Sequence, residues 1–379
     1  MLLLLGLAGA ATLTIWNPDP FMDWIYEGGV FLLAGWVAMR TKVRFGLSVT
    51  IWVVLAVWGF VQLGAGWTVY GNATLNGSLR VTAFSATALV ASVVFSRPQR
   101  RERLLRGFAW FGLLVGVVSV VAYYASPGRI LWLFPSPYPD VWGPFLSRNN
   151  FAQFMELVFP VALWLACSGR RSEDRLTYMW MSAVMLACGL AASSRAGAAL
   201  LVLETLGVFL LVRPRPSRRL VAGFAAGAIV FAALAGGDTL IQRLHDSDPL
   251  QYRREIYASS LAMIAERPWT GYGLGTFATV YPEFASFDAG AVVEHAHNDW
   301  LEWAGGGGWL YAGVWLLLAL AVVRPALRSI WGIGVVAVFL HALVDYPFAR
   351  FGVAAWLFIL VGALENSSAR TAPYKRRMK

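Results

Sequence analysis

Long apolar segments separated by short polar connections run along almost the whole chain, and this pattern constrains the fold more than any other feature. We place these segments near residues 2–16, 24–39, 46–63, 79–96, 107–125, 149–168, 176–192, 197–212, 220–236, 304–323, 329–345 and 350–364. Many approach the roughly 20 residues with which a helix crosses a bilayer, where a helix satisfies its own backbone hydrogen bonds. The sequence therefore predicts an all-α polytopic membrane protein with about twelve transmembrane helices, and strands are not required anywhere.

Composition excludes the main soluble alternatives. Hydrophobic residues make up 58% of the 379 residues and charged residues only 14%, with a mean hydropathy of +0.59, whereas soluble domains carry about 25% charged residues. The two cysteines, Cys167 and Cys188, lie inside apolar segments and have no metal-binding spacing. These values exclude a cytosolic enzyme, a disordered chain and a secreted disulfide scaffold. They predict one transmembrane domain over residues 1–379.

The net charge of +10 is explained mainly by membrane topology. Twenty-two of the 31 Lys and Arg residues fall on one side of the twelve-helix pattern, within residues 40–44, 97–106, 170–175, 213–219, 324–328 and 370–379. The positive-inside rule places these connections, and both termini, in the cytoplasm. The basic excess is therefore no evidence of nucleic-acid binding.

Nine arginines break this bias, because they lie on the other side or at its edge. They are Arg80, Arg129, Arg148, Arg195, Arg243, Arg253, Arg254, Arg267 and Arg350. Guanidinium groups bind phosphate and carboxylate in a bidentate manner. The sequence therefore predicts an anionic partner on the outer side.

The longest outer connection covers residues 237–303, between the ninth and tenth segments. It holds ten of the 21 acidic residues and three of the four His. Within it, residues 252–266 have apolar side chains at helical spacing, which predicts a helix on the membrane surface. A second outer connection, residues 126–148, is rich in Pro and aromatic residues. Connections this long are usually functional.

The sharpest polar motif in the long connection is the hexapeptide EHAHND at residues 294–299. Three interpretations stay open. His295 and His297 have a spacing that lets two imidazoles bind one metal ion. One of them, held by a neighbour, could instead act as a general acid or base on an anionic substrate. The pair could also be solvated or cap the helix that follows.

Three arginine-bearing motifs accompany it, each with a structural alternative. Arg195 lies between two predicted helices among small residues that would let a phosphate approach, but it could equally extend to the membrane interface. The doublet Arg253-Arg254 suits pyrophosphate, although lipid-facing charge would also explain it. Arg148 begins a segment in which an Asn could cap the helix and the Arg could be an interface anchor.

A late apolar segment carries a further polar pair, His341 and Asp345. The two residues are four apart, so they share one face of a helix. Ionisable residues inside membrane helices are usually functional, and a purely structural pairing stays an alternative. The segment GYGLG at residues 271–275 lacks the context and the Lys of a phosphate-binding loop.

Together these motifs resemble the O-antigen ligase and O-antigen polymerase superfamily of bacterial membrane glycosyltransferases. Arg148 to Ala152 is similar to its N-x-F-A segment, and Ser194 to Gly197 is similar to its S-R-G/A-x turn. The segment PWTGYGLGTF resembles its P-x-x-G-x-G-x-x-x-F stretch. His297-Asn298, followed by nine residues, Gly308, two residues and Tyr311, resembles its H-[N/S/Q]-x9-G-x-x-[G/T/Y] signature. The similarity runs from about residue 145 to 347.

The resemblance implies a GT-C-like fold and a metal-independent, inverting transferase without a cofactor. It implies a donor glycan on undecaprenyl pyrophosphate and a glycan, lipid A-core or protein acceptor. The active site would lie on the periplasmic side of the bacterial inner membrane. A polymerase that joins repeat units, and a transporter or flippase for lipid-linked glycans, remain alternatives.

The resemblance also assigns roles to residues. His297 becomes the general base, while Arg195 and either Arg254 or Arg253 bind the pyrophosphate. His295, Asn298 and Asp299 shape the site. Asp345, His341 and Arg148 are further candidates.

Overall fold

The computed structural model describes residues 1–17, 19–41, 47–169, 171–234, 252–287, 290 and 292–365. Within these ranges the chain is mostly helical. The longer helices are α1 (Leu2–Leu13), α2 (Pro20–Arg40), α3 (Leu47–Ala65), α4 (Gly71–Val94), α5 (Pro98–Ala125), α6 (Arg148–Ser168), α7 (Ser172–Ala191), α8 (Arg195–Leu211), α9 (Arg218–Leu234), α11 (Arg253–Glu266), α13 (Asp299–Arg328) and α15 (Phe351–Glu365). Shorter elements are α12 (Phe277–Phe284), α14 (Ile333–His341) and the 3₁₀ turns η1 (Ile330–Gly332) and η2 (Pro347–Ala349).

Each of the twelve predicted apolar segments overlaps a helix, so the all-α prediction is confirmed for the described residues. The helix predicted over residues 252–266 is also present as α11. One local difference is a short antiparallel hairpin of β1 (Arg129–Ile130) and β2 (Phe134–Pro135), where the sequence required no strand.

Among the described residues, five helices are both long and apolar enough to cross a membrane, namely α3, α4, α5, α6 and α13. Shorter apolar helices cover Leu2–Leu13, Ile330–His341 and Phe351–Glu365. These helices are what a multi-pass membrane protein requires. The twelve-span topology stays a prediction.

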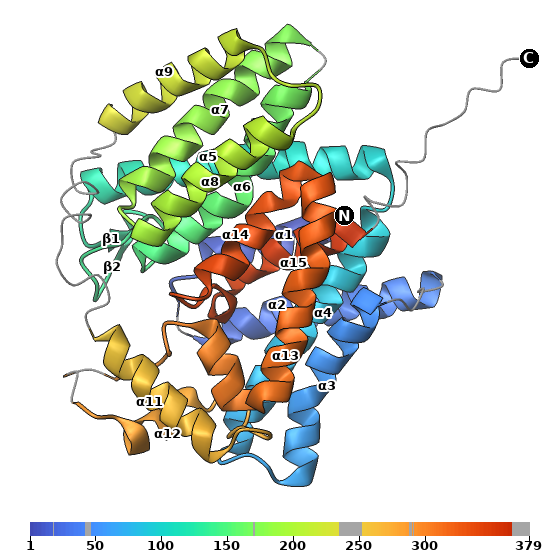
Figure 1. Cartoon of the computed structure of the whole chain (residues 1–379), viewed down its shortest axis with the longest axis vertical. Helices are drawn as coiled ribbons and strands as arrows, with labels where there is room; N and C mark the ends of the chain where they lie inside the picture. The colour runs from blue at the N-terminus through green and yellow to red at the C-terminus, as the bar shows by residue number, and fades with distance from the viewer. Residues whose placement is uncertain are drawn as a thin grey trace, which may run out of the picture.

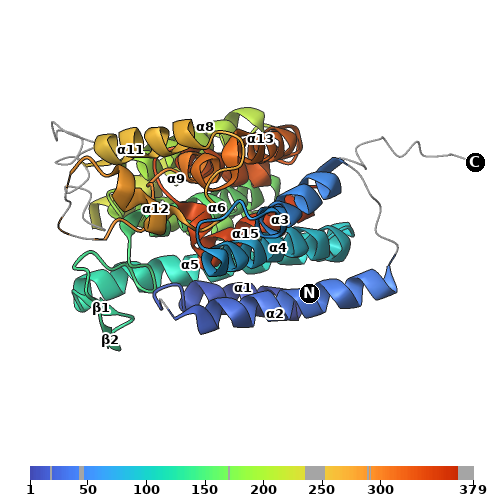
Figure 2. The same cartoon turned by 90° about the horizontal axis from the view of Figure 1, so that it is seen from below.

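Two helices form the centre of the bundle. Nearly every residue of α6 and of α15 is buried. α6 packs against α5, α7, α8 and α14, while α15 packs mainly against α4 and α1. Figures 1 and 2 both place β1, β2, α11 and α12 on one side of the bundle, and the end of α2 with the start of α3 on the opposite side. The described parts of the two long connections predicted to be outer are therefore on the same side; Arg243 and residues 237–251 as a whole lie outside the described residues.

Capping side chains fix where the motif-bearing helices begin. Ser147 accepts a hydrogen bond from the Asn149 amide at the start of α6, so the cap is this serine and not an asparagine. Ser194 caps α8 by accepting from the Gly197 amide at 3.2 Å. Such caps satisfy amides that have no partner inside the helix. They place the residue after the cap, Arg148 or Arg195, at the first helical position.

A kink in α13 at Gly308 explains how the GYGLG segment packs against this helix. Gly308 has φ +78°, which interrupts the helix. The Trp309 amide donates to the Pro268 carbonyl at 2.8 Å instead of bonding four residues back. The carbonyl freed at Gly305 accepts from the Tyr272 amide at 3.0 Å. The segment is therefore docked backbone-to-backbone on α13, which agrees with the prediction that it is not a phosphate-binding loop.

Candidate active site

His297 lies at the start of α13 in a constrained backbone conformation. Its φ is +50°, a region that non-glycine residues rarely occupy and that often marks functional sites. Two neighbouring contacts hold it there. The Tyr257 hydroxyl of α11 donates to the His297 carbonyl at 2.9 Å, and Asn298 caps α13 by accepting from the Leu301 amide at 3.1 Å. The direction of the imidazole is therefore set by α11 and α13 together.

The buried carboxylate of Asp345 faces this imidazole. His297 Nδ1 lies 3.4 Å from Asp345 Oδ1, and the side chains are 34% and 2% exposed. Nδ1 has no hydrogen-bond partner among the described residues, but such contacts are often long before substrate binds. Burial alone would raise the pKa of Asp345, yet contact with His297 and the charges of Arg253 and His341 outweigh it and lower that pKa. Asp345 is therefore an anion at neutral pH, and it faces Nδ1 of His297.

The second histidine has a carboxylate of its own. His295 Nδ1 lies 3.1 Å from Glu302 Oε1 on α13, and Glu302 also accepts from the Ala296 amide at 3.1 Å. The Tyr346 ring stacks on His295 at 4.4 Å and meets His297 edge-on at 5.0 Å. Each imidazole therefore faces a carboxylate of its own, and both contact the Tyr346 ring.

A tight turn at residues 341–346 organises these contacts. The Asp299 amide donates to the carbonyls of Ala342 and Asp345 at 2.9 and 3.2 Å. Arg253 of α11 donates to the Val344 carbonyl at 2.6 Å. The turn therefore connects the motif 294–299, α11 and Asp345. We call His295, His297 and the residues that contact them the histidine cluster.

A buried pair anchors this turn in the bundle. His341 Nδ1 lies 2.7 Å from Glu156 Oε1 of α6, and both side chains are at most 1% exposed. The sequence predicted that His341 and Asp345 share one helix face. Among the described residues they form no direct ion pair, although their charges still interact. α14 ends at His341, and each side chain has a direct partner from another segment, Glu156 for His341 and His297 for Asp345.

The structure separates the two adjacent arginines of α11. Arg253 is half-buried and contacts the turn that carries Asp345, whereas Arg254 is exposed on the same helix. Adjacent helical side chains differ by about 100° in direction. Arg253 is therefore the member of the doublet that is directed toward the histidine cluster.

Arg148 and Arg195 lie at the neighbouring starts of α6 and α8. A Cβ added to Gly197 would lie 2.6 Å from Cβ of Ala152, so the two helix starts are in close contact. Arg148 forms an ion pair with Asp140 of the outer connection at 3.2 Å, and Arg195 is half-buried. The positive ends of the two helix dipoles add to this pair of charges.

Comparison with known proteins identifies the segment that carries most of this cluster. A family model described as O-antigen ligase matches residues 180–316. The chain is related to the O-antigen ligases. An O-antigen ligase from Pseudomonas aeruginosa is 26% identical over 288 residues, which are 73% of this chain and 64% of that protein. A general O-oligosaccharyltransferase from Acinetobacter baylyi is 22% identical over 360 residues, or 83% and 60% of the two chains. This chain thus spans less than two thirds of the length of either relative.

The matched segment contains Arg195, Arg253 and the two histidines, but not Asp345, the partner of His297, nor the pair of Glu156 and His341. Glu156 and Asp345 both lie outside residues 180–316. Sequence reasoning missed Glu156, Glu302, Tyr257 and Tyr346. Only Glu302 had a local signal, because it lies one helical turn after the EHAHND motif. The other three meet the histidine cluster through contacts between distant segments.

Proposed function

We propose that this protein transfers a glycan from a polyprenyl pyrophosphate, in bacteria undecaprenyl pyrophosphate, to a hydroxyl group of an acceptor. The observation that carries the proposal is the pair of His297 and buried Asp345 beside Arg253. The similarity to O-antigen ligases and to an oligosaccharyltransferase supports it. The site would lie on the periplasmic side of the inner membrane, because the elements around it share the side that the charge distribution predicts to be outer.

The proposed chemistry begins at the acceptor. Nε2 of His297 takes the proton of the acceptor hydroxyl as its oxygen attacks the anomeric carbon, and Asp345 stabilises the imidazolium that forms. The bond from the anomeric carbon to the pyrophosphate oxygen breaks, and the polyprenyl pyrophosphate leaves with both electrons. One displacement of this kind inverts the anomeric centre.

The leaving pyrophosphate needs positive charge, which the arginines would supply. Arg253 and Arg195 are the proposed pyrophosphate ligands, with Arg148 at the adjacent helix start. Fixed charges aimed at the group where negative charge develops stabilise a transition state strongly. In this proposal the arginines take the role that a metal ion has in other glycosyltransferases.

The other residues of the cluster hold the site in shape. Glu302 fixes His295, which flanks the acceptor space together with Tyr346. Asn298 and Asp299 hold the start of α13 against the turn at 341–346. Glu156 and His341 hold that turn from inside the bundle.

The acceptor is tested by offering several to the same purified protein. The full chain in detergent receives a polyprenyl-pyrophosphate glycan with a lipid A-core oligosaccharide, a second glycan repeat or a hydroxyl-bearing peptide. Covalent transfer to the first supports a ligase, and to the second a polymerase. Movement of donor across a vesicle membrane without any joined product would contradict the proposal and support a flippase. Activity that disappears in chelator and returns with a divalent cation would contradict the metal-independent step.

A further inference from the structure

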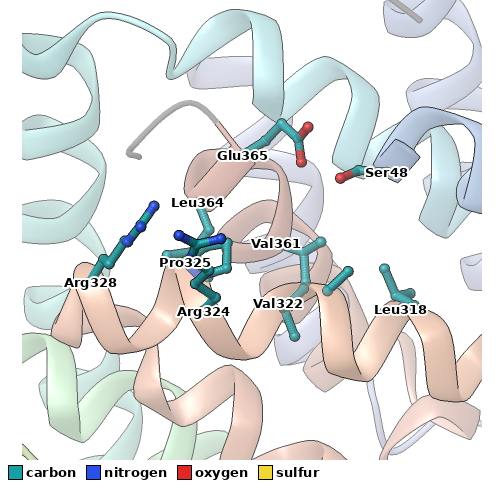
Figure 3. Close-up of a pocket in the computed structure, with 10 residues that line it drawn as sticks. Ser48, Leu318, Val322, Arg324, Pro325, Arg328, Val361, Leu364 and Glu365 are labelled. Atoms are coloured by element: carbon teal, nitrogen blue, oxygen red, sulfur yellow. The ribbon is translucent and has the colours of Figure 1, made fainter. Parts of the chain in front are cut away.

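A cavity of about 260 Å³ lies far from the histidine cluster, between the ends of three helices. It is formed by the end of α13, the end of α15 and the start of α3, and its lining residues are Ser48, Leu318, Ala321, Val322, Arg324, Pro325, Arg328, Val361, Leu364 and Glu365. Figure 3 shows Arg324 and Arg328 on α13, with Glu365 at the end of α15. The charge distribution predicts that this side is cytoplasmic.

The cavity has an apolar depth and a charged rim. Leu318, Val322, Val361 and Leu364 line the depth and are at most 5% exposed. Arg324 and Arg328 are both exposed at the rim. The rim and the depth therefore suit a ligand with an anionic end and an apolar remainder.

The two rim arginines are available to a ligand. They are four residues apart, so they lie on the same face of α13 about one turn from each other. Within the described part of the chain, neither guanidinium forms an ion pair or a hydrogen bond. By contrast, Arg106 on α5 is neutralised by Glu102 and Asp174. Two guanidinium groups one turn apart can hold one phosphate between them.

We propose that this cavity binds one anionic phospholipid of the inner leaflet, with its phosphodiester between Arg324 and Arg328 and an acyl chain along the apolar lining. The rim carries two Arg and one Glu, which gives it one net positive charge. A headgroup with one negative charge, such as phosphatidylglycerol, matches this charge. Basic pockets between membrane helices on the cytoplasmic side are a known means of binding anionic lipid headgroups. The apolar depth favours a lipid over free phosphate, because phosphate has no apolar group that could fill it.

The test measures lipid binding to the full chain in detergent by native mass spectrometry, with phosphatidylglycerol and phosphatidylcholine as probes. Arg324→Gln with Arg328→Gln should weaken phosphatidylglycerol binding about 30-fold, at about 1 kcal/mol for each arginine. Phosphatidylcholine binding should change little. The matched control is Arg100→Gln with Arg103→Gln, which removes two exposed charges on α5 and should leave binding at this site unchanged.

A second variant separates a lipid from a free anion. Ala321→Phe fills the apolar lining and leaves both arginines in place, so it should reduce phosphatidylglycerol binding. Inorganic phosphate at millimolar concentration should not displace the lipid from the wild type. Equal binding of phosphatidylglycerol to the wild type and the double Gln variant would overturn the proposal. The proposal would also be overturned if phosphate alone displaced phosphatidylglycerol, or if the wild type bound phosphatidylglycerol and phosphatidylcholine with equal affinity.

Discussion

Replacing Asp345 with asparagine removes the charge that faces His297 while keeping the size of the side chain. Two unit charges 3.4 Å apart attract by about 5 kcal/mol at an effective dielectric of 20. One third of His297 is exposed, so solvent screening reduces this to roughly 2–3 kcal/mol. This stabilisation exists only once His297 has taken a proton, so it belongs to the transition state. We therefore expect Asp345→Asn to lower kcat by about 30- to 150-fold.

The assay is glycan transfer by the purified full chain, with kcat and the donor KM measured separately. The donor KM should change less than threefold, because Asp345 does not bind the pyrophosphate in this account. Glu283→Gln, which removes an exposed carboxylate on α12, is the control and should keep wild-type kcat. A kcat for Asp345→Asn within threefold of the wild type would refute the reasoning. An increase in donor KM alone would also refute it.

Further predictions concern the arginine doublet, the second histidine, the kink in α13 and acid stability. Arg253→Gln should lower kcat/KM for the donor by about 10- to 100-fold, as expected for the loss of a charge-assisted contact, and Arg254→Gln should lower it by less than threefold. A larger loss in Arg254→Gln than in Arg253→Gln would exclude Arg253 as the pyrophosphate ligand. Glu302→Ala should lower kcat more than Glu302→Gln, which keeps an acceptor for the Ala296 amide; equal rates in the same assay would remove the role of Glu302. Gly308→Ala combines a positive φ with a Cβ placed 2.2 Å from the Trp269 carbonyl oxygen, so it should cost about 3 kcal/mol or more, and an unchanged melting temperature in detergent would contradict it. Because the pKa of Asp345 is lowered from 3.8, the stabilisation by its charge is present above about pH 4 and is lost as pH falls through the lowered value; the melting-temperature gap between wild type and Asp345→Asn should therefore shrink below about pH 4, and a gap that grows in acid would contradict this.

Local patterns predicted the helices well, because an apolar segment long enough to cross a bilayer has few other ways to satisfy its backbone. The start of α13 was predicted less well: the apolar segment begins near residue 304, whereas Asn298 caps the helix at Asp299. The EHAHND motif and the doublet on α11 were also recognisable, since each is contiguous in sequence. Their chemistry could be proposed before any contact was known.

Pairings between distant segments could not be predicted in this way. Glu156 and His341 are 185 residues apart, and no local spacing indicates that α6 and α14 place them in contact. Within the described ranges, His341 and Asp345 form no direct ion pair for a related reason: each side chain lies next to a partner from a distant segment, Glu156 or His297. The partner of His297 depends on the turn at 341–346, and only the packed bundle shows it.

The most direct test of the account is the rate of covalent glycan transfer by wild type and His297→Ala, measured with donor bound at saturation. Product is quantified by mass spectrometry, and donor binding is measured separately on the same preparations. The account predicts that His297→Ala binds donor as the wild type does but forms joined product at least 100-fold more slowly, within the range for loss of a general base. Wild-type transfer by His297→Ala would contradict the central claim, because the proposed chemistry begins at this imidazole.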